Sequence, residues 1–130
     1  MGKPIIIEER IEMSKFQHLE LLSRGPVTTV RLLSCRPYSV GELVELTNEW
    51  NSIADRADCQ TLLVDCSNVQ LLSSEMLSKL ILLQRRLKLK KARLLLSGLR
   101  TEVREILSWT RLDRFFEIYE DEEREAAALA

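Results

Sequence analysis

Residues 61–77 read TLLVDCSNVQLLSSEML, which combines a short apolar run, a polar loop and the start of an amphipathic segment. The apolar run Thr61–Asp65 is typical of a buried strand in a parallel sheet that helices cover. After the loop, apolar side chains recur at helical spacing and predict a long helix. Its expected inner face comprises Leu77, Leu80, Ile81, Gln84 and Leu87, and its end falls among Lys88, Lys90 and Lys91.

The sequence before this unit predicts a β-hairpin and then another helix. Two β-prone runs, Leu19–Leu22 and Val27–Leu33, flank Ser23–Pro26, where a glycine and a proline favour a turn. Ser39, with Glu42 three residues later, has the form of a capping box that opens a helix. Apolar side chains then recur at helical spacing as far as Ala57, namely Leu43, Leu46, Trp50, Ile53 and Ala54.

The sequence after residue 91 repeats the alternation of strand and helix. Ala92–Leu96 predicts an apolar strand, and Thr101 is the expected N-cap of a following helix. Phe115–Tyr119 predicts a last strand, in which the alternation of faces places one phenylalanine ring inside. A terminal helix is expected from Asp121 onward. The inward positions of the helix that follows Thr101 are Val103, Ile106 and Leu107.

The expected element order is β-β-α-β-α-β-α-β-α. Strands that alternate with helices form parallel sheets through right-handed crossovers. We therefore expect an α/β fold with a mixed sheet, an N-terminal β-hairpin, parallel β-α crossovers and a C-terminal helix. Residues 1–17 are expected to form an N-terminal arm and residues 18–130 a single domain. Sites in such sheets form where strands lead into helices, which directs attention to residues 65–77 and 97–101.

The composition disfavours several classes of function. The 130 residues, 45% hydrophobic and 30% charged, suit a soluble domain with its own core. With 19 Lys+Arg and 20 Asp+Glu the net charge is -1, so we expect no overall attraction to nucleic acid. Cys35, Cys59, Cys66 and the single histidine, His18, match no metal-ligand or nucleophile-base pattern. We expect no metal, no cofactor and no enzymatic activity, and we expect His18 on the surface of a strand.

The beginning of the chain contains only a short apolar run, Ile5–Ile7, before a charged stretch. A signal peptide or a membrane helix needs a longer apolar segment. The sequence therefore predicts no direct membrane insertion and a cytoplasmic location, where the cysteine thiols remain reduced.

Residues 65–77, together with the strand-helix order, resemble the STAS domain family, which is named for sulfate transporters and anti-sigma factor antagonists. The loop of that family reads Asp-x-Ser-x-Val, two apolar residues and then Asp-Ser-Ser/Thr-Gly-Leu. Ser73 replaces the second Asp of this pattern, Glu75 replaces Ser or Thr, and Met76 replaces Gly. The matching positions are Asp65, Ser67, Val69, Leu71, Leu72, Ser74 and Leu77.

The resemblance implies a non-enzymatic regulator of transcription that acts by protein-protein association. Its implied partner is an anti-sigma factor kinase or a related regulatory protein, and phosphorylation of the motif serine ends the capture. Ser74 stands at the phosphoacceptor position, with Ser73 as a second candidate. The simpler alternative is that Ser73 or Ser74 only caps the helix, and both roles are compatible. The implied partner-binding residues are Asp65, Ser73, Ser74, Glu75 and Met76.

Three of these residues raise separate questions. Asp65 is expected to organise the loop by accepting hydrogen bonds from backbone N–H groups. Glu75 already places a carboxylate at the helix start, so one hypothesis makes it a fixed partial substitute for phosphate. Met76 could extend an apolar contact patch or obstruct a kinase, although filling the core is the favoured interpretation.

Other interpretations remain open at this stage. The chain could be an accessory or scaffold STAS subunit of a transport or lipid-handling complex, with a degenerate switch that is not phosphorylated. Trp50 and Trp109 favour core or boundary packing over partner contact, and a homodimer is one option. The basic residues around the end of the second helix favour a solvated helix end over a contact with nucleic acid or anionic lipid. They are Arg85, Arg86, Lys88, Lys90, Lys91 and Arg93.

Overall fold

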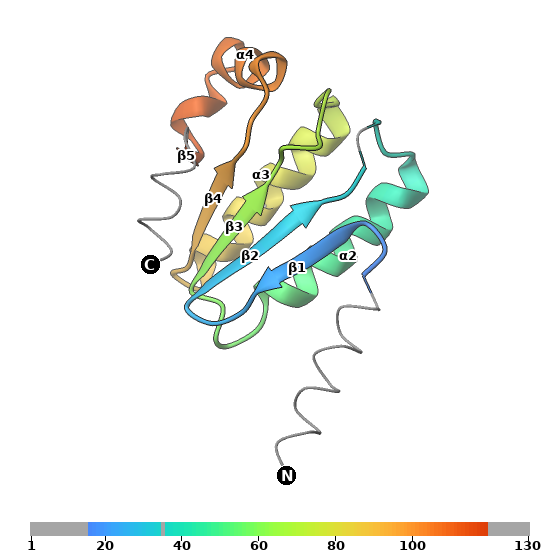
Figure 1. Cartoon of the computed structure of the whole chain (residues 1–130). Helices are drawn as coiled ribbons and strands as arrows, with labels where there is room; N and C mark the ends of the chain where they lie inside the picture. Colours follow the sequence, from blue (N-terminus) through green and yellow to red (C-terminus); the bar gives the residue numbers. More distant parts are fainter. Residues whose placement is uncertain (1–15, 35, 120–130) are drawn as a thin grey trace.

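A computed structural model describes residues 16–34 and 36–119, and Figure 1 shows their arrangement. The elements alternate as the sequence predicts. The predicted C-terminal helix, and the predicted N-terminal arm apart from residues 16 and 17, lie outside the described residues, as does Cys35. The elements are β1 (Leu19–Ser23), β2 (Val27–Leu32), α2 (Val40–Ala54), β3 (Thr61–Asp65), α3 (Ser74–Leu89), β4 (Arg93–Ser97), α4 (Thr101–Trp109), the 3-10 helix η1 (Leu112–Arg114) and β5 (Glu117–Tyr119).

The five strands form one sheet in the order β1-β2-β3-β4-β5. The pair β1/β2 is antiparallel, and the pairs β2/β3, β3/β4 and β4/β5 are parallel. The expected mixed α/β fold with an N-terminal hairpin is therefore confirmed. In Figure 1, α2 and α3 run side by side along the sheet, and α2, α3 and α4 begin at the end where the parallel strands finish.

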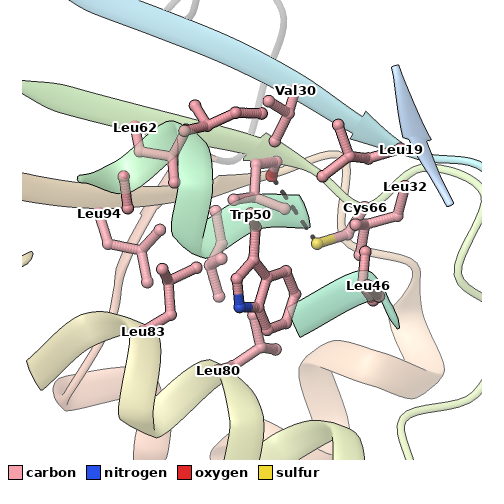
Figure 2. Packing of buried hydrophobic residues seen from close by; sticks show 14 of the residues in the cluster. Leu19, Val30, Leu32, Leu46, Trp50, Leu62, Cys66, Leu80, Leu83 and Leu94 are labelled. Carbon is pink, nitrogen blue, oxygen red and sulfur yellow. Dashed lines mark hydrogen bonds between the residues drawn. The ribbon is translucent and has the colours of Figure 1, made fainter. Parts of the chain in front are cut away.

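The core lies between the sheet and the helices. Trp50 of α2 is fully buried, as expected, and Figure 2 shows its ring beside Leu80 and Leu83 of α3. Leu62 of β3 and Leu94 of β4 face the same layer. Burial of such side chains is the main force that stabilises the packing of helices on the sheet.

Trp109 behaves differently from Trp50, and the expectation of core or boundary packing is wrong for it. It is the last residue of α4, and 81% of its surface is exposed. The helix buries the face that carries Val103 and Leu107. Trp109 follows Leu107 by two positions, so it projects about 200° further round the helix.

Two helix ends differ from the sequence predictions. The first helix ends at Ala54 rather than Ala57, because Asp55 is its C-cap and Lys90 Nζ donates hydrogen bonds of 2.7 Å to the carbonyl oxygens of Ala54 and Arg56. Thr101 is the first residue of α4 and not its N-cap. Arg100 occupies the cap position with extended backbone angles and makes no capping hydrogen bond through its side chain.

The last strand is shorter than predicted, since Phe115 and Phe116 are not part of it. After α4 the chain reverses through Arg111, whose φ of 61° is left-handed, and then forms η1, with Phe115 as its C-cap. The strand begins only at Glu117. Phe116 is buried in the core and meets Phe115 edge to face at 5.1 Å between ring centres, so one ring is inside as expected.

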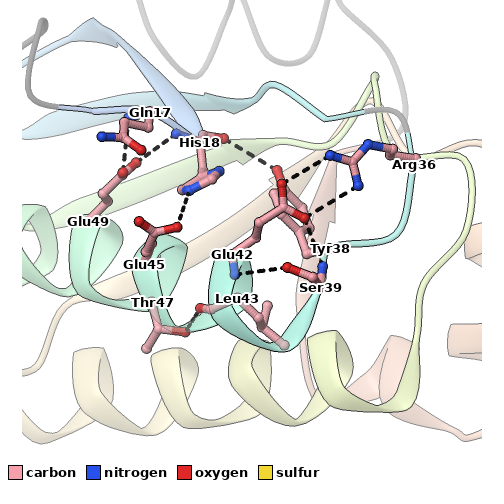
Figure 3. A network of polar contacts seen from close by, with 10 residues as sticks. All are labelled: Gln17, His18, Arg36, Tyr38, Ser39, Glu42, Leu43, Glu45, Thr47 and Glu49. Carbon is pink, nitrogen blue, oxygen red and sulfur yellow. Dashed lines mark hydrogen bonds and ion pairs between the residues drawn. The ribbon is translucent and has the colours of Figure 1, made fainter.

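Figure 3 shows the polar contacts that hold the start of α2. The predicted capping box is present: Glu42 N donates to Ser39 Oγ (3.2 Å), and Ser39 N donates to Glu42 Oε1 (2.9 Å). Arg36 also binds the Glu42 carboxylate. The backbone N–H of Ser39, its hydroxyl group and Arg36 together lower the pKa of Glu42. These contacts give α2 a defined beginning at the carboxyl end of the sheet.

The same network connects α2 to the start of β1. The backbone N–H groups of Gln17 and His18 donate to the Glu49 carboxylate at 2.9 and 3.0 Å. His18 Nε2 lies 3.2 Å from Glu45 Oε1. His18 precedes β1 and its ring is mostly buried against Tyr38, so the expectation of a surface position in a strand is wrong. Burial raises the pKa of the Tyr38 hydroxyl group.

Candidate functional site

Asp65 closes β3 and organises the loop that leads to α3. Its Oδ1 accepts a hydrogen bond from the backbone N–H of Ser67 at 2.9 Å, as the sequence analysis expected. Its Oδ2 accepts one from Arg31 Nε at 3.1 Å, and Arg31 also reaches Glu20 Oε1 at 3.4 Å. Only 20% of the Asp65 side chain is exposed. Both carboxylate oxygens are thus used within the fold.

The β3–α3 loop is held against the β4–α4 loop. Gly98 adopts a φ of +66°, and a Cβ at this position would lie 2.8 Å from Asp65 Oδ1 and 3.1 Å from the backbone nitrogen of Ser67. Arg100 Nε donates to the carbonyl oxygen of Ser67 at 3.0 Å. Only glycine combines this backbone conformation with such a close approach. The two loops therefore form one unit at the carboxyl end of the sheet.

Apolar side chains anchor the underside of the β3–α3 loop. Cys66, Val69 and Met76 are buried and line a small apolar cavity with residues of β2, α3, β4 and α4. Only 4% of Met76 is exposed, so it fills the core and offers almost no surface to a partner. Burial raises the pKa of the Cys66 thiol to about 12, which keeps it protonated and unreactive at neutral pH.

Ser73 and Ser74 are neighbours with different surroundings. Ser73 is the N-cap of α3, and its Oγ accepts a hydrogen bond of 3.1 Å from Met76 N. Ser74 is the first helical residue and is exposed. Its hydroxyl group donates only a long hydrogen bond of 3.5 Å to Glu75 Oε2. The capping role thus belongs to Ser73, and Ser74 presents its hydroxyl group to solvent.

Glu75 and Leu71 complete the exposed surface at this helix start. Glu75 lies in the first turn of α3, where the helix dipole favours a negative charge. Leu71, in the loop just before α3, is 58% exposed. An apolar side chain next to a hydroxyl group and a carboxylate offers a partner both buried area and polar contacts.

Sequence reasoning missed Arg31 altogether. It directed attention to the segments that contain Asn68, Gly98 and Arg100, but it did not predict the contacts that these residues make. Asn68 Nδ2 donates to the Leu32 carbonyl oxygen at 3.1 Å and so ties the loop to β2. Arg31 lies directly beside Asp65 because of the register between β2 and β3. This register exists only in the assembled sheet, so the sequence alone does not indicate the contact. Gly98 is visible in the sequence as a turn residue, but its contact with Asp65 is not.

Within residues 16–34 and 36–119, no group of three or more His, Cys, Asp or Glu side chains is placed to hold a metal ion. None of the helices in this part of the chain is both long enough and apolar enough to cross a membrane.

A protein-family model described as the STAS domain matches residues 8–125. This match covers most of the chain, including every element of the site described above. No curated protein matches the chain.

Several solved structures share the fold at low sequence identity. A STAS domain protein from Planctomyces limnophilus is 17% identical over 85% of this chain and 96% of its own, with a TM-score of 0.73. The anti-sigma factor antagonist SpoIIAA in its unphosphorylated form is 16% identical over 84% of this chain and 90% of its own, with a TM-score of 0.66. RsbS from Moorella thermoacetica, carrying a serine-to-glutamate substitution, is 17% identical over 87% and 95%, with a TM-score of 0.68.

Proposed function

This chain belongs to the STAS domain family, and from that premise we propose that it is a non-enzymatic, cytoplasmic protein-binding module that resembles the anti-sigma factor antagonists. Its partner is an anti-sigma factor kinase or a related regulatory protein, so that its effect is on transcription. The docking surface surrounds the first turn of α3, where Leu71, Ser74 and Glu75 are exposed. The observation that carries the proposal is the exposed hydroxyl group of Ser74. It follows a loop that hydrogen bonds connect to β2 and to the segment after β4.

The surroundings of Ser74 suit a switch by phosphorylation. The first N–H groups of a helix have no partner within the helix, and the dipole favours an anion there. A phosphate on Ser74 adds about -1.5 to -2 charge at this point. Because Ser73, and not Ser74, caps the helix, modification of Ser74 leaves the Ser73–Met76 hydrogen bond intact. The surface that a partner contacts changes while the fold is retained.

The structural relatives supply the chemistry that the proposal extends to this chain. SpoIIAA is known in an unphosphorylated and in a phosphorylated form. The RsbS variant carries glutamate in place of a serine. We extend such a modification to this chain and place it on Ser74, whose hydroxyl group is exposed at the start of α3.

Glu75 favours a second candidate function. Its carboxylate lies 3.5 Å from Ser74 Oγ, so an added phosphate would meet a like charge at once. In this alternative Glu75 is a fixed substitute for phosphate, and the chain is an accessory or scaffold subunit of a transport or lipid-handling complex. The switch is then degenerate and Ser74 is never modified.

The experiment that tests the main proposal is incubation of the full chain with its candidate kinase and ATP, followed by location of phosphate by mass spectrometry. We expect label on Ser74, none on the Ser74→Ala variant, and loss of kinase capture after labelling. Ser108→Ala, which removes an exposed serine of α4, is the matched control and keeps the label. Label confined to Ser73, or no label with an active kinase, contradicts the switch.

Co-purification separates the two candidates. Recovery of a histidine-kinase-like ATPase together with a sigma factor supports the main proposal, and recovery of a permease or a transporter ATPase supports the alternative. The Glu75→Ser variant tests whether the Glu75 carboxylate substitutes for phosphate. If it does, this change alters capture of the partner and leaves the melting temperature nearly unaltered. An unchanged affinity contradicts that role for Glu75.

A further inference from the structure

The opposite end of α3 carries an unusual combination of side chains. The last residues of α3 and the two residues after it read RRLKLKK (85–91), at the end of the sheet where the parallel strands begin (Figure 1). Leu89 lies among these cations and is 88% exposed, which makes it the most exposed large apolar side chain in the described part of the chain. We call Arg85, Lys88, Leu89 and Lys91 the basic end.

The other cations near the basic end, Arg86, Lys90 and Arg93, are engaged in contacts within the fold. Arg86 binds the Asp55 carboxylate through two hydrogen bonds of 2.7 and 2.6 Å, and Arg93 binds Glu117. Lys90 caps α2 through the carbonyl oxygens of Ala54 and Arg56. The structure shows no ion pair from Arg85, Lys88 or Lys91 to any described carboxylate. These three charges are available to an external anion.

Backbone hydrogen bonds fix the segment that directly follows the basic end. Ala92 N donates to the Leu87 carbonyl oxygen at 2.8 Å, and Arg93 N donates to that of Gln60 at 2.9 Å. The Lys88 ammonium lies 5.2 Å from the centre of the Phe115 ring, a cation–π contact. These contacts hold the backbone that follows Leu89, and the cation–π contact positions the Lys88 side chain.

The helix dipole explains the lysines but not the leucine. Cations are favoured in the last turn of a helix, so Lys88 and Lys91 need no ligand for that reason alone. Leu89 gains nothing from the dipole and exposes its apolar side chain to water. An exposed apolar side chain among cations combines the two contacts that hold a protein on an anionic bilayer, namely apolar burial and attraction to headgroup charge.

We propose that the basic end is a docking surface for a membrane rich in anionic lipid. Leu89 enters the boundary between headgroups and acyl chains, and Arg85, Lys88 and Lys91 contact the lipid phosphates. Nucleic acid fits less well, because bases stack on aromatic side chains and Leu89 offers no such contact. A protein partner also fits less well, since lysine is depleted at protein interfaces. The contact is peripheral and weak when it acts alone.

This orientation leaves the start of α3 accessible. The 16 residues of α3 span about 24 Å. With Leu89 at the bilayer, Ser74 and Glu75 lie at the other end of the helix, separated from the lipid by nearly its whole length. The inference uses a different surface from the proposed partner site and does not rest on it, so either can fail without the other.

Vesicle flotation of the full chain tests the proposal. We expect binding to vesicles of phosphatidylcholine with about one-third phosphatidylglycerol, none to phosphatidylcholine alone, and a steep decrease with salt. Lys88→Gln and Lys91→Gln should each weaken binding about fivefold. Leu89→Ser should weaken it by about the same factor or more, with the unfolding transition unchanged in each variant.

Leu33→Ser and Lys79→Gln are the matched controls, because they change a 44% exposed leucine at the carboxyl end of β2 and a lysine nearer the start of α3. Both should bind as the unchanged chain does. The proposal is overturned if the unchanged chain does not bind the anionic vesicles, or if Leu89→Ser binds them equally well, which would leave only loose charge attraction. It is also overturned if the chain binds duplex DNA at 200 mM salt and ignores the vesicles.

Discussion

At each end of the sheet, two neighbouring residues of the same type have different roles. At the carboxyl end Ser73 caps α3, and the next residue, Ser74, exposes its hydroxyl group. At the amino end Lys90 caps α2 through two carbonyl oxygens, and the next residue, Lys91, makes no ion pair with any described residue. At each end one residue closes the fold, and its neighbour makes no such capping contact. Residue type alone does not separate the two roles, since each pair is chemically identical.

The largest expected effect concerns the contact between the two loops of the carboxyl end. Gly98→Ala should lower the free energy of unfolding by about 3 kcal/mol, because the new Cβ meets Asp65 Oδ1 at 2.8 Å and φ is +66°. Denaturant unfolding measures this. Gly41→Ala is the control, since that position is helical and open, and it should raise stability by about 0.5–1 kcal/mol. A Gly98→Ala loss below about 1 kcal/mol would mean that the two loops are not tightly coupled.

A smaller effect distinguishes the two serines directly. Ser73→Ala should cost about 1 kcal/mol of unfolding free energy, because the cap on Met76 N is lost. Ser74→Ala should cost almost nothing, because its hydroxyl group makes only a long contact with Glu75. Urea unfolding of both variants gives the comparison. Equal losses would show that both serines support the helix and would weaken the case for Ser74 as the available one.

The smallest expected effect concerns the amino end and depends on pH. Two hydrogen bonds from Arg86 lower the pKa of the Asp55 carboxyl group below its usual 3.8. A lowered folded-state pKa adds stability above the unfolded value and loses it as pH falls through the folded one. Arg86→Gln should therefore lower stability at pH 7 by less than about 1 kcal/mol, as expected for an exposed pair.

Urea titrations at successive pH values check this prediction. The difference between Arg86→Gln and the unchanged chain should stay constant from pH 7 to about pH 5 and shrink below about pH 4. Arg85→Gln is the control, because the structure shows no ion pair from Arg85 to a described carboxylate, and its effect should not change with pH. A difference that persists unchanged in acid would show that packing of Arg86, and not its charge, stabilises the end of α2.

Local patterns predicted most of the fold correctly because each rests on neighbours in the chain. The Gly-Pro turn, the capping box at Ser39 and the apolar run at Thr61–Asp65 all appear where expected. One error falls where a distant segment intervenes, because Lys90 at the far end of α3 closes α2 three residues early. Another is local: after the left-handed turn at Arg111, Phe115 becomes the C-cap of η1 and not part of the last strand.

The candidate site shows the same division. The sequence located the loop from Asp65, because it predicts a strand end and a helix start there. It was the resemblance to the STAS motif that singled out Ser73, Ser74 and Glu75 within that segment. The partners of that loop were not identifiable. Arg31, Gly98 and Arg100 come from β2 and from the segment after β4, and only the strand register and loop packing bring them to Asp65 and Ser67.

The amino-acid order by itself determined the alternation of strands and helices, since periodicity and capping act over a few residues. Tertiary structure decided which lysine closes α2 and which tryptophan is buried. The physical reason is that a helix end or an ammonium group takes whatever partner the packing brings within hydrogen-bond distance, and for Lys90 that partner lies more than 30 residues away in the chain.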